Sequence, residues 1–490
     1  MPQPAILAID QGTTNTKALL VSPDGAIRAR ASRPMTLTHP QPGWSEQSAD
    51  AIWASVAAAV DELVTGAPDT TIAAVAISNQ RETIVLWDAA TGRPLAPAIS
   101  WQCRRSSDRC AVLRAAGHEA MVLERTGLGL DPLFPAAKLA WLLDAIPGAR
   151  DRAAAGELRA GTVDSWLLWN LTGGTVHATD HGNAARTQLL NLRTLEWDAT
   201  LLALFGVPRT LLPDLRASDS LFGTVAAGRT ALPAGIPIHA VMGDSHAALF
   251  GHGIREPGAA KVTIGTGSSI MALTGGPVQS ANGLSSTIAW SRGDRAHYAL
   301  EGNIAVSGHT AAFVARLLGM ADEAALSALA ETVDDSGGVV VVPALAGLGA
   351  PHWQDRARGL IAGMTLGTTP AHIARAAFEA IALQIVDLCR AMEADLGITM
   401  PAISVDGGAT RNAFLLQLLA DLLDRAVERR ADPELSALGA ARMAAEALGL
   451  PARPAAADNL ELFVPAMRDD RRQAIHRQWT ASILQATPPL

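Results

Sequence analysis

The pattern that most constrains the fold of this chain occurs twice, once at its start and once past its middle. In both places a short apolar run leads through a turn rich in glycine and threonine into a second apolar run. The runs and turns are Ala5–Ile9, Gly12-Thr13-Thr14 and Ala18–Val21 in the first place, and Ala260–Ile264, Gly265-Thr266-Gly267 and Ile270–Leu273 in the second. Short apolar runs joined by tight turns predict antiparallel β-strands. Because the pattern recurs, the sequence predicts a chain made of two similarly built halves.

The first of these patterns continues into a third strand. The run Ala18–Val21 ends at Ser22-Pro23-Asp24-Gly25, which is a strong turn signal, and another segment begins at Ala26. Three short strands joined by tight turns predict an antiparallel meander. A Rossmann unit or a P-loop would instead pass from the first strand into a helix. The sequence therefore argues against both of these nucleotide-binding folds.

The remaining segments predict a mixed α/β protein. Helices are expected over Ala49–Val64, Ala247–Phe250, Asn412–Leu423 and Ser436–Leu448, and further strands over Ile72–Ile77, Ile84–Trp87, Ile236–Met242 and Ile403–Val405. A chain of 490 residues is long enough for two large domains. We expect the break between them near residues 245–258, which divides the chain into domains of residues 1–250 and 251–490.

Composition and charge exclude several classes of partner. The net charge of −8 argues against a nucleic-acid-binding protein, which needs a basic face. A single tyrosine, 8 phenylalanines and 11 tryptophans also leave few rings on which successive bases could stack. We expect no membrane partner, because no signal peptide is visible and no apolar run approaches the roughly 20 residues of a membrane helix. Three cysteines cannot form a disulfide framework in a chain of this size, which favours a cytoplasmic location.

The glycine- and threonine-rich turns offer the groups that bind phosphate. Thr13–Asn15 in the first turn, and Thr266 with Gly267 in the second, carry hydroxyls, an amide and closely spaced backbone N–H groups. If the two turns face each other, they form a phosphate clamp, to which Lys17 adds a positive charge. A third glycine-rich turn at Asp406–Ala409 favours this interpretation. The alternative is that each turn only connects two strands of a hairpin.

Two aspartates that follow apolar strands are candidates for chemistry. Asp10 ends the first strand beside the first turn, where a carboxylate suits a magnesium ion held largely through water. Asp244 follows Val241-Met242-Gly243, and a carboxylate at the end of an apolar strand can act as a general base. The alternatives are structural. Asp10 would cap its turn, and Asp244 would be the N-cap of a helix that starts near Ala247.

Two further motifs could bind a small hydroxylated molecule. The adjacent pair Arg81-Glu82 follows a buried strand, and such a pair can grip vicinal hydroxyls, with the arginine donating and the glutamate accepting hydrogen bonds. Trp101 would form an apolar wall of a pocket, and Arg104 would hold neighbouring acidic groups. The alternatives are a solvated surface pair for Arg81-Glu82 and core packing for Trp101.

Seven motifs occur in one order along the chain. They are Asp10-Gln-Gly-Thr-Thr14, Asn79-Gln-Arg-Glu-Thr83, Trp101-Gln-Cys-Arg-Arg105, Gly161-Thr-Val-Asp-Ser-Trp166, Gly265-Thr-Gly267, Gly347-Leu-Gly-Ala-Pro351 and Asp406-Gly-Gly-Ala409. In this ordered set the chain resembles the FGGY carbohydrate kinases, and within that family the glycerol kinases most. The resemblance covers essentially the whole chain, and the seven motifs together are highly specific.

The resemblance implies a fold and a function. The fold is α/β, with two actin-like (ribonuclease H-like) ATPase domains around a central cleft. ATP and Mg²⁺ bind between the two halves, and the polyol binds mainly in the first. The reaction is ATP-dependent phosphorylation of a primary hydroxyl of a small polyol or ketose. Because actin-like folds also host proteins that are not kinases, the alternative is a non-catalytic regulatory protein that binds nucleotide and sugar.

The resemblance also implies roles for individual residues and leaves the assembly open between a homodimer and a homotetramer. Asp244 corresponds to the catalytic base, and Asp10 to the aspartate associated with magnesium. The positions implied in substrate binding are Arg81, Glu82, Trp101, Leu133, Asp244, Ser245 and Ser269. The positions implied in nucleotide binding are Thr13, Thr14, Asn15, Lys17, Thr266, Gly267, Gly308, Gly408 and Asn412.

Four positions depart from the pattern of the glycerol kinases. Those enzymes carry tyrosine at the position of Leu133, glutamine at that of Ser245 and phenylalanine at that of Ser269. On the nucleotide side, Ala312 replaces a glutamine. The first three changes shrink or alter the groups that would enclose a three-carbon polyol. We therefore expect intact catalytic groups beside a wider pocket, which would take glycerol or a four- to five-carbon polyol or ketose.

Overall fold

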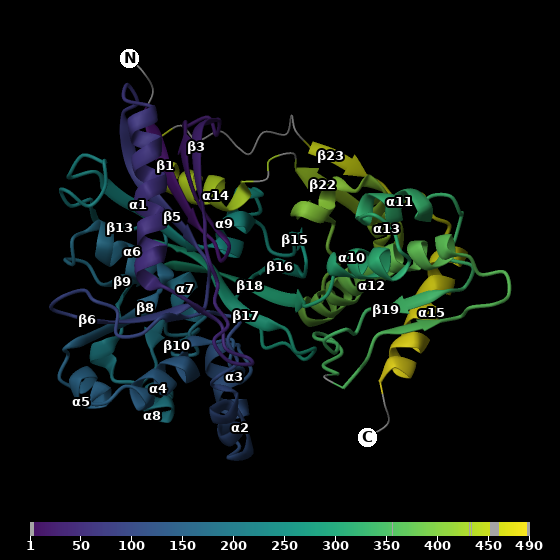
Figure 1. Ribbon diagram of the computed structural model, residues 1–490, viewed down its shortest axis with the longest axis horizontal. Helices are drawn as coiled ribbons and strands as arrows, with labels where there is room; N and C mark the ends of the chain where they lie inside the picture. Colours follow the sequence, from purple (N-terminus) through teal and green to yellow (C-terminus); the bar gives the residue numbers. More distant parts are fainter. Residues whose placement is uncertain (1–3, 355, 431, 433, 451–459, 488–490) are drawn as a thin grey trace.

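Two mixed β-sheets organise the fold, and each is built from one half of the chain (Figure 1). The computed structural model describes residues 4–354, 356–430, 432, 434–450 and 460–487. Across the first sheet, the strands are β13 (Leu221–Thr224), β14 (Pro237–Gly243), β5 (Ile72–Asn79), β1 (Ala5–Gln11), β2 (Asn15–Val21) and β3 (Ile27–Pro34). Across the second, they are β17 (Ser285–Arg292), β18 (Arg295–Ile304), β16 (Ser268–Thr274), β15 (Ala260–Ile264), β21 (Ala402–Asp406), β22 (Ala426–Arg430) and β23 (Leu460–Phe463).

The two sheets repeat one strand arrangement. β1 pairs antiparallel with β2 and parallel with β5, and β15 pairs in the same two ways with β16 and β21. Further out, β2 pairs antiparallel with β3 as β16 does with β18, and β5 pairs parallel with β14 as β21 does with β22. The predicted duplication is therefore confirmed, and so is the predicted meander of β1, β2 and β3.

Smaller sheets and most of the helices surround these two sheets. The smaller sheets are a four-stranded one of β4 (Glu46–Gln47), β7 (Ala98–Ile99), β6 (Ile84–Asp88) and β8 (Leu158–Thr162), and the pairs β10 (Leu190–Asn191) with β11 (Glu196–Trp197), β9 (Ala178–Asp180) with β12 (Asp214–Arg216), and β19 (Val340–Val342) with β20 (Leu360–Ala362). The surrounding helices are α2 (Ser107–Ala115), α3 (Glu119–Thr126), α4 (Pro135–Ala145), α5 (Ala149–Ala154), α6 (Val163–Leu171), α7 (His181–Ala185), α8 (Ala199–Phe205), α10 (His309–Leu317), α11 (Glu323–Ala330), α12 (Pro370–Leu396), α13 (Ala413–Leu423) and α15 (Asp469–Ala486).

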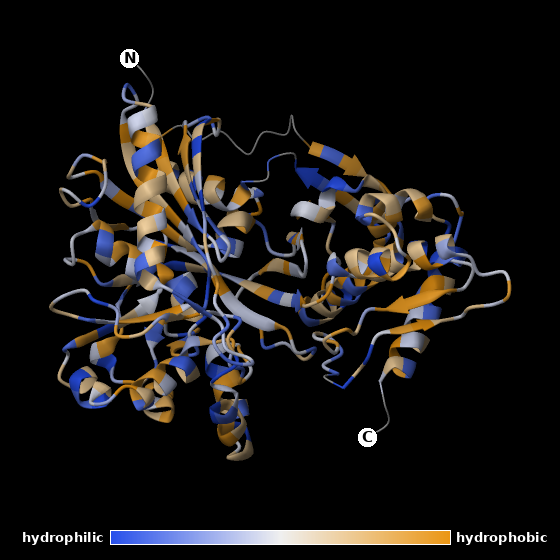
Figure 2. Ribbon diagram, in the orientation of Figure 1, coloured by the Kyte–Doolittle hydropathy of each residue, from blue (hydrophilic) through white to orange (hydrophobic). Residues whose placement is uncertain are grey.

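Helices cover both faces of the first sheet. α1 (Ala49–Gly66) shares a hydrophobic core with Ala5, Leu7 and Ile9 of β1, and α14 (Leu435–Ala447) shares another with Ile6 and Ala8. Because both faces are buried, the strand is apolar along its length and does not alternate with polar residues. By contrast, α1 carries both hydrophobic and hydrophilic residues (Figure 2).

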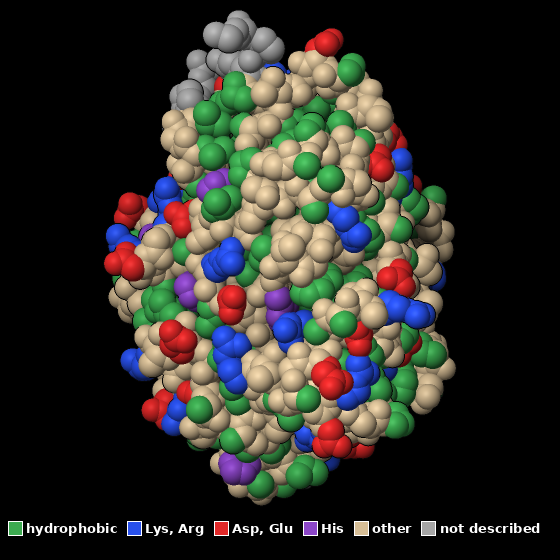
Figure 3. Space-filling view, turned by 90° about the vertical axis from the view of Figure 1, so that its left-hand side faces the viewer, with side chains coloured by type: hydrophobic (Ala, Val, Ile, Leu, Met, Phe, Trp, Pro, Cys, Tyr) green, Lys and Arg blue, Asp and Glu red, His purple; other side chains and the backbone are tan. Residues whose placement is uncertain are grey.

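The surface carries charges of both signs. On the face shown in Figure 3, basic and acidic side chains are interspersed over the whole view. Within the part of the chain that the structure describes, the helices are too short or too polar to cross a lipid bilayer.

The predicted helices and strands are found with small shifts at their ends, but one helix start is wrong. The helix expected near Ala247 begins three residues earlier, because α9 spans Asp244–Gly251. By contrast, α13 starts directly after Asn412, which accepts a hydrogen bond of 3.0 Å from the backbone N–H of Leu415 and so caps the helix.

A close helix crossing joins α14, from the second half of the chain, to the first sheet. α14 packs on α9 and on β1, β5 and β14, and Figure 1 shows it beside α9. At this crossing a Cβ on Gly439 would lie 1.8 Å from the Ala247 carbonyl oxygen, and a Cβ on Gly251 would lie 2.3 Å from the Leu435 carbonyl oxygen. Only glycine allows the two backbones to approach this closely.

The division into domains of residues 1–250 and 251–490 stays a prediction.

Gly439→Ala should destabilise the protein, because the added methyl group has no space against the backbone of α9. We expect the free energy of unfolding to fall by at least about 1–3 kcal/mol, the usual cost of overpacking. Urea denaturation measures this change. Gly66→Ala is the matched control, because a Cβ at this exposed helix end meets no heavy atom within 4 Å. Equal unfolding midpoints for the two variants would contradict the prediction.

Candidate active site

Arg81 and Glu82 lie in the turn between β5 and β6, and both side chains are buried. Arg81 is 9% exposed and Glu82 is 5% exposed, so the alternative of a solvated surface pair is wrong. Glu82 has a φ of 60°, a left-handed conformation that costs energy for a residue with a side chain. The Lys138 ammonium donates a hydrogen bond of 3.2 Å to the Glu82 carbonyl oxygen and so holds this conformation.

Arg81 joins two carboxylates that lie far apart in the sequence. Its Nη2 and Nη1 donate to the two oxygens of Glu301 at 2.6 and 3.0 Å. Its Nε lies 3.4 Å from Asp244 Oδ1, and its Nη2 donates to the Ser245 hydroxyl at 3.3 Å. A two-point arginine–carboxylate pair fixes the plane of the guanidinium. The structure thus brings the predicted substrate residues Arg81, Asp244 and Ser245 together.

Asp244 is the first residue of α9 and follows β14 directly. Gly243 is the N-cap of this helix, so the alternative that Asp244 is the N-cap is wrong. The Asp244 carboxylate accepts a hydrogen bond of 2.6 Å from the backbone N–H of the next residue, Ser245. Burial raises the pKa of Asp244, although Arg81 lowers it. The side chain nevertheless keeps 38% of its surface exposed. A reachable carboxylate that is more basic than usual has the properties of a general base.

Asp10 lies at the same edge of the sheet, beside Ser78 of β5 in the strand register. Its carboxylate accepts a hydrogen bond of 2.8 Å from the Ser78 hydroxyl. Burial raises the pKa of Asp10 to about 6, and the negative charge of Asp244 adds to the increase. Two carboxylates that repel each other suit a bound cation, so these residues fit a magnesium ion. Lys17 is not a free cation here, because it pairs with Glu434 at 2.7 Å.

Hydrogen bonds connect the first glycine- and threonine-rich turn to the predicted substrate residues. The Trp101 indole N–H donates to the Thr13 hydroxyl at 2.9 Å, and Thr13 donates to Gln80 Oε1 at 3.3 Å. Gln80 directly precedes Arg81, so hydrogen bonds link the turn to the buried charges. Trp101 is partly exposed and is therefore not a core residue. Within the turn, Thr14 is exposed, and Asn15 hydrogen-bonds a serine of β3.

The second such turn has a backbone cradle that only glycine permits. The N–H groups of Ser307 and Gly308 donate to the carbonyl oxygens of Thr266 and Gly265, both at 3.0 Å. A Cβ on Gly308 would lie 2.3 Å from the Gly265 carbonyl oxygen, and a Cβ on Gly267 would lie 2.5 Å from another backbone carbonyl oxygen. The two N–H groups are therefore engaged within the protein, and phosphate binding at Thr266, Gly267 and Gly308 stays a prediction.

The third turn follows β21 and lies against the second. A Cβ on Gly407 would lie 2.4 Å from the carbonyl oxygen of Ile264, the last residue of β15. Gly408 begins a short 3₁₀ helix that leads to Asn412. The Asn412 side chain both caps α13 and donates a hydrogen bond of 3.0 Å to the Ser327 hydroxyl. The structure therefore places this turn against the end of β15, and it engages the Asn412 side chain within the protein.

Two positions that depart from the glycerol kinase pattern lie next to the buried charges. The Leu133 carbonyl oxygen accepts a hydrogen bond of 2.6 Å from Lys138, which also binds the carbonyl of Glu82. Ser269 of β16 donates a hydrogen bond of 3.4 Å to Glu301. Leu133 and Ser269 thus share direct partners with the predicted substrate residues.

Three buried charged residues of this site are not among the predicted ones. They are Glu301, Arg186 and Lys138, with exposures of 1%, 1% and 0%. Arg186 Nε donates to Glu82 Oε1 at 2.6 Å, and its Nη1 lies 3.0 Å from Glu301 Oε2. Lys138 interrupts the apolar run Ala136–Ala140. A charge inside an apolar run is rarely buried without a partner, and this signal could have identified Lys138. Glu301 follows only two apolar residues, Ala299 and Leu300, and no local signal marks it.

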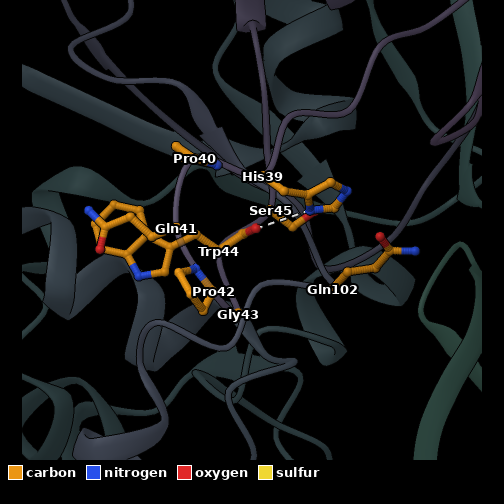
Figure 4. Close-up of a pocket in the computed structure, with 8 residues that line it drawn as sticks. All are labelled: His39, Pro40, Gln41, Pro42, Gly43, Trp44, Ser45 and Gln102. Atoms are coloured by element: carbon orange, nitrogen blue, oxygen red, sulfur yellow. Dashed lines mark hydrogen bonds between the residues drawn. The ribbon is translucent and has the colours of Figure 1, made fainter.

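A hollow of about 520 Å³ lies beside this site (Figure 4). It is lined by the segment His39–Ser45 and by Gln102, and the His39 ring binds the Trp44 carbonyl oxygen at 3.1 Å across it. Gln102 directly follows Trp101, but the catalytic and nucleotide-binding candidates do not line the hollow. The chemistry is therefore assigned to the buried charges and not to this hollow.

Comparison with known proteins identifies the family. The model for the N-terminal domain of the FGGY family of carbohydrate kinases matches residues 5–251, and the model for its C-terminal domain matches residues 260–448. The chain belongs to the FGGY family of carbohydrate kinases. The resemblance inferred from the seven motifs is thereby confirmed.

Full-length relatives and solved structures agree with this family. The chain is 46% identical over 489 residues to a glycerol kinase of Alkalilimnicola ehrlichii, covering 98% of both chains. It is 45% identical over 494 residues to an apulose kinase of Pectobacterium atrosepticum, covering 99% of both. The structure of Plasmodium falciparum glycerol kinase with ADP superimposes with a TM-score of 0.94 at 30% identity, covering 100% of this chain and 99% of the other.

These similarities confirm the predicted class of fold and of activity. The protein has the two-domain α/β fold of FGGY kinases with actin-like ATPase domains. It is an enzyme that phosphorylates a small polyol or ketose with ATP. The alternative of a non-catalytic regulatory protein is therefore not favoured.

Lys138→Met tests the electrostatic cost of the buried ammonium. Burial lowers the pKa of Lys138 to about 7, although Glu82 raises it, whereas an unfolded lysine titrates near about 10.4. Below pH 7 both states are protonated and the burial cost is fully present. Between about pH 7 and 10 only the unfolded chain keeps the proton, so the stability contributed by this group rises with pH.

We therefore expect the free energy of unfolding of the native protein, relative to Lys138→Met, to rise by about 2–3 kcal/mol from pH 7 to pH 9. Urea denaturation at the two pH values measures it. The comparison with the variant cancels the titration of all other groups. A stability difference that is constant, or that falls with pH, would show that Lys138 stays protonated in the native state.

Proposed function

We propose that Asp244 is the catalytic base and that the substrate hydroxyl binds beside it and Arg81. The observation that carries this proposal is the Asp244 carboxylate itself, which is 38% exposed, lies 3.4 Å from Arg81 Nε and has a pKa raised by burial. Arg81 donates hydrogen bonds to the vicinal hydroxyls of the substrate, and Glu82 accepts them. Trp101, Leu133, Ser245 and Ser269 complete the substrate pocket.

In the proposed reaction, Asp244 takes the proton of a primary hydroxyl. The hydroxyl oxygen forms a bond to the γ-phosphorus of ATP while the bond from that phosphorus to the ADP oxygen breaks. Phosphoryl transfer asks a protein mainly for positioning and for stabilisation of negative charge. The backbone and side chains that we assign to the phosphates and the nucleotide belong to Thr13, Thr14, Asn15, Lys17, Thr266, Gly267, Gly308, Gly408 and Asn412.

Asp10 is the residue that we assign to magnesium. Its carboxylate would hold the ion mainly through water, and the ion would offset negative charge on the phosphates. Lys17 reaches the phosphates only if it exchanges its partner Glu434, which neutralises it at 2.7 Å. The Asn412 side chain hydrogen-bonds Ser327. We therefore assign Asn412 to the nucleotide site through its position at the start of α13 and not through its side chain.

Two observations support a substrate of four to five carbons alongside glycerol. Leu133 and Ser269 are smaller than the tyrosine and phenylalanine of the glycerol kinase pattern, and both lie beside the buried charges. The chain is also as similar to the apulose kinase, at 45% identity, as to the glycerol kinase, at 46%. We therefore propose a small polyol or ketulose that is larger than glycerol as the better substrate.

Several expectations about the surroundings of the enzyme stay predictions. They are the cytoplasmic location, the absence of nucleic-acid and membrane partners, and the assembly as a homodimer or homotetramer. A size-exclusion measurement with light scattering would decide the assembly.

Asp244→Asn tests the catalytic base. The amide keeps the shape of the side chain but cannot take a proton, so we expect kcat to fall by about 10²–10⁴-fold while the carbohydrate KM changes little. Coupled ADP-release assays with glycerol, erythritol, erythrulose, xylulose, ribulose and apulose measure both constants. Asp50→Asn is the matched control, because Asp50 is an exposed aspartate in the first turn of α1. Activity that survives in Asp244→Asn would remove Asp244 from the base role.

Ser269→Phe combined with Leu133→Tyr tests the size of the pocket. We expect kcat/KM for the five-carbon ketoses to fall by about 10- to 200-fold relative to glycerol, the range that changes in pocket volume produce. Ser269→Ala is the control, because it removes the hydroxyl without filling space. The proposal fails if the native enzyme prefers glycerol to the five-carbon ketoses, or if the double variant leaves the preference of the native enzyme unchanged.

A further inference from the structure

Glu301 is a buried carboxylate that the second half of the chain places in the substrate site of the first half. It lies in β18, a strand of the second sheet near the middle of Figure 1, and is 1% exposed. Arg81 binds its two oxygens at 2.6 and 3.0 Å, and Arg186 Nη1 lies 3.0 Å from Oε2. Burial alone would raise the pKa of Glu301, but the two arginines outweigh burial and hold this pKa well below its ordinary value.

The two arginines connect Glu301 to the groups that we assign to the substrate. Arg81 Nε lies 3.4 Å from Asp244, and Arg186 Nε donates to Glu82 at 2.6 Å. Five side chains of alternating charge therefore form a row. The carboxylates at its two ends are the proposed catalytic base and a proposed substrate ligand. Glu301 is in the centre and is itself inaccessible to a substrate.

We propose that Glu301 is a positioning residue for carbohydrate binding, which holds Arg81 and Arg186 so that Asp244 and Glu82 face the substrate hydroxyls. This inference rests on the function proposed above. An arginine side chain has several rotatable bonds, and a two-point carboxylate partner fixes its guanidinium plane.

The consequence of removing the charge of Glu301 follows from the remaining partners. Two buried guanidiniums would then lie close together without the anion that separates their charges. The carboxylates that would still contact them are Asp244 for Arg81 and Glu82 for Arg186. Each arginine would pair fully with one of them and so occupy the oxygens that the substrate needs.

Glu301 also links the substrate site to the second sheet. Ser269 of the neighbouring strand β16 donates a hydrogen bond of 3.4 Å to the same carboxylate. The arginines come from the first half of the chain, whereas Glu301 and Ser269 come from the second. The substrate site is therefore complete only where the two halves meet.

A different interpretation is that this row of charges only stabilises the fold. Buried ion pairs are weak support for stability as a whole, but removing one partner is costly because it leaves uncompensated charge. A purely structural role would lower the stability of the protein and leave the affinity for carbohydrate unchanged. A positioning role changes the carbohydrate KM, which separates the two interpretations.

Glu301→Gln tests the proposal, because it removes the charge and keeps the size of the side chain. Initial rates are measured with glycerol and with apulose as the varied substrate, then with ATP varied, together with thermal unfolding. We expect the carbohydrate KM to rise roughly 10- to 100-fold, as for a misplaced binding group, and the KM for ATP to stay near that of the native enzyme.

Glu379→Gln is the matched control. Glu379 is 4% exposed and pairs with Arg375 at 3.3 Å within α12, so it is a buried ion pair outside the substrate site. We expect it to lower thermal stability without changing the carbohydrate KM. If Glu301→Gln does not fold, Glu301→Asp takes its place, because it keeps the charge but withdraws it by one methylene group from the arginines.

The outcomes separate this inference from the function on which it rests. A raised carbohydrate KM in the Glu301 variant, with an unchanged one in Glu379→Gln, supports the positioning role. An unchanged carbohydrate KM in a folded Glu301 variant overturns that role and leaves the proposed function intact. If the native protein releases no ADP with either carbohydrate, the proposed function fails, and this inference fails with it.

Discussion

The active site depends on the register of three parallel strands. β1, β5 and β14 run side by side, with Asp10 opposite Ser78 and Gly243 opposite Asn79. Residues that follow the ends of parallel strands meet at one edge of the sheet, as in other open α/β sheets. The backbone pairing therefore brings Asp10, the Arg81 turn and Asp244 to the same edge of the sheet. Because a shift of one residue would turn each side chain to the opposite face, the hydrophobic core on both faces also fixes the chemistry.

The position of Asp244 further depends on packing by a distant part of the chain. Asp244 begins α9, and α14 crosses this helix where Gly439 and Gly251 leave no room for side chains. The α14 residues share a core with the strand residues Ile6 and Ala8. A helix that lies in sequence between β22 and β23 of the second sheet thus packs α9, which carries the proposed base, against the first sheet. The two duplicated halves consequently cannot be regarded as independent bodies at this site.

The sequence predicts the local parts of this arrangement and misses the non-local ones. Strands, turns and the duplication follow from short apolar runs and glycines, and the site residues that adjoin strand ends, such as Arg81 and Asp244, follow with them. The pairing of Lys17 with Glu434 joins residues that are 417 positions apart, and no local sequence pattern predicts this ion pair. Glu301 and Arg186 were missed for the same reason, because burial of a charge depends on partners that only the folded chain brings together. The start of α9 at Asp244 shows the same limit at a helix end.

The surroundings of the site carboxylates shift their pKa values in different directions. Asp10 and Asp244 are raised in pKa mainly by burial, and their charges repel each other. Glu301 is more deeply buried, yet two arginines hold its pKa low. The arginine charges therefore act largely on Glu301, and the pKa values of Asp244 and Asp10 stay raised, which agrees with their proposed roles as base and magnesium ligand. Carboxylates whose environments separate their pKa values in this way can act as base, ligand and fixed charge within one site.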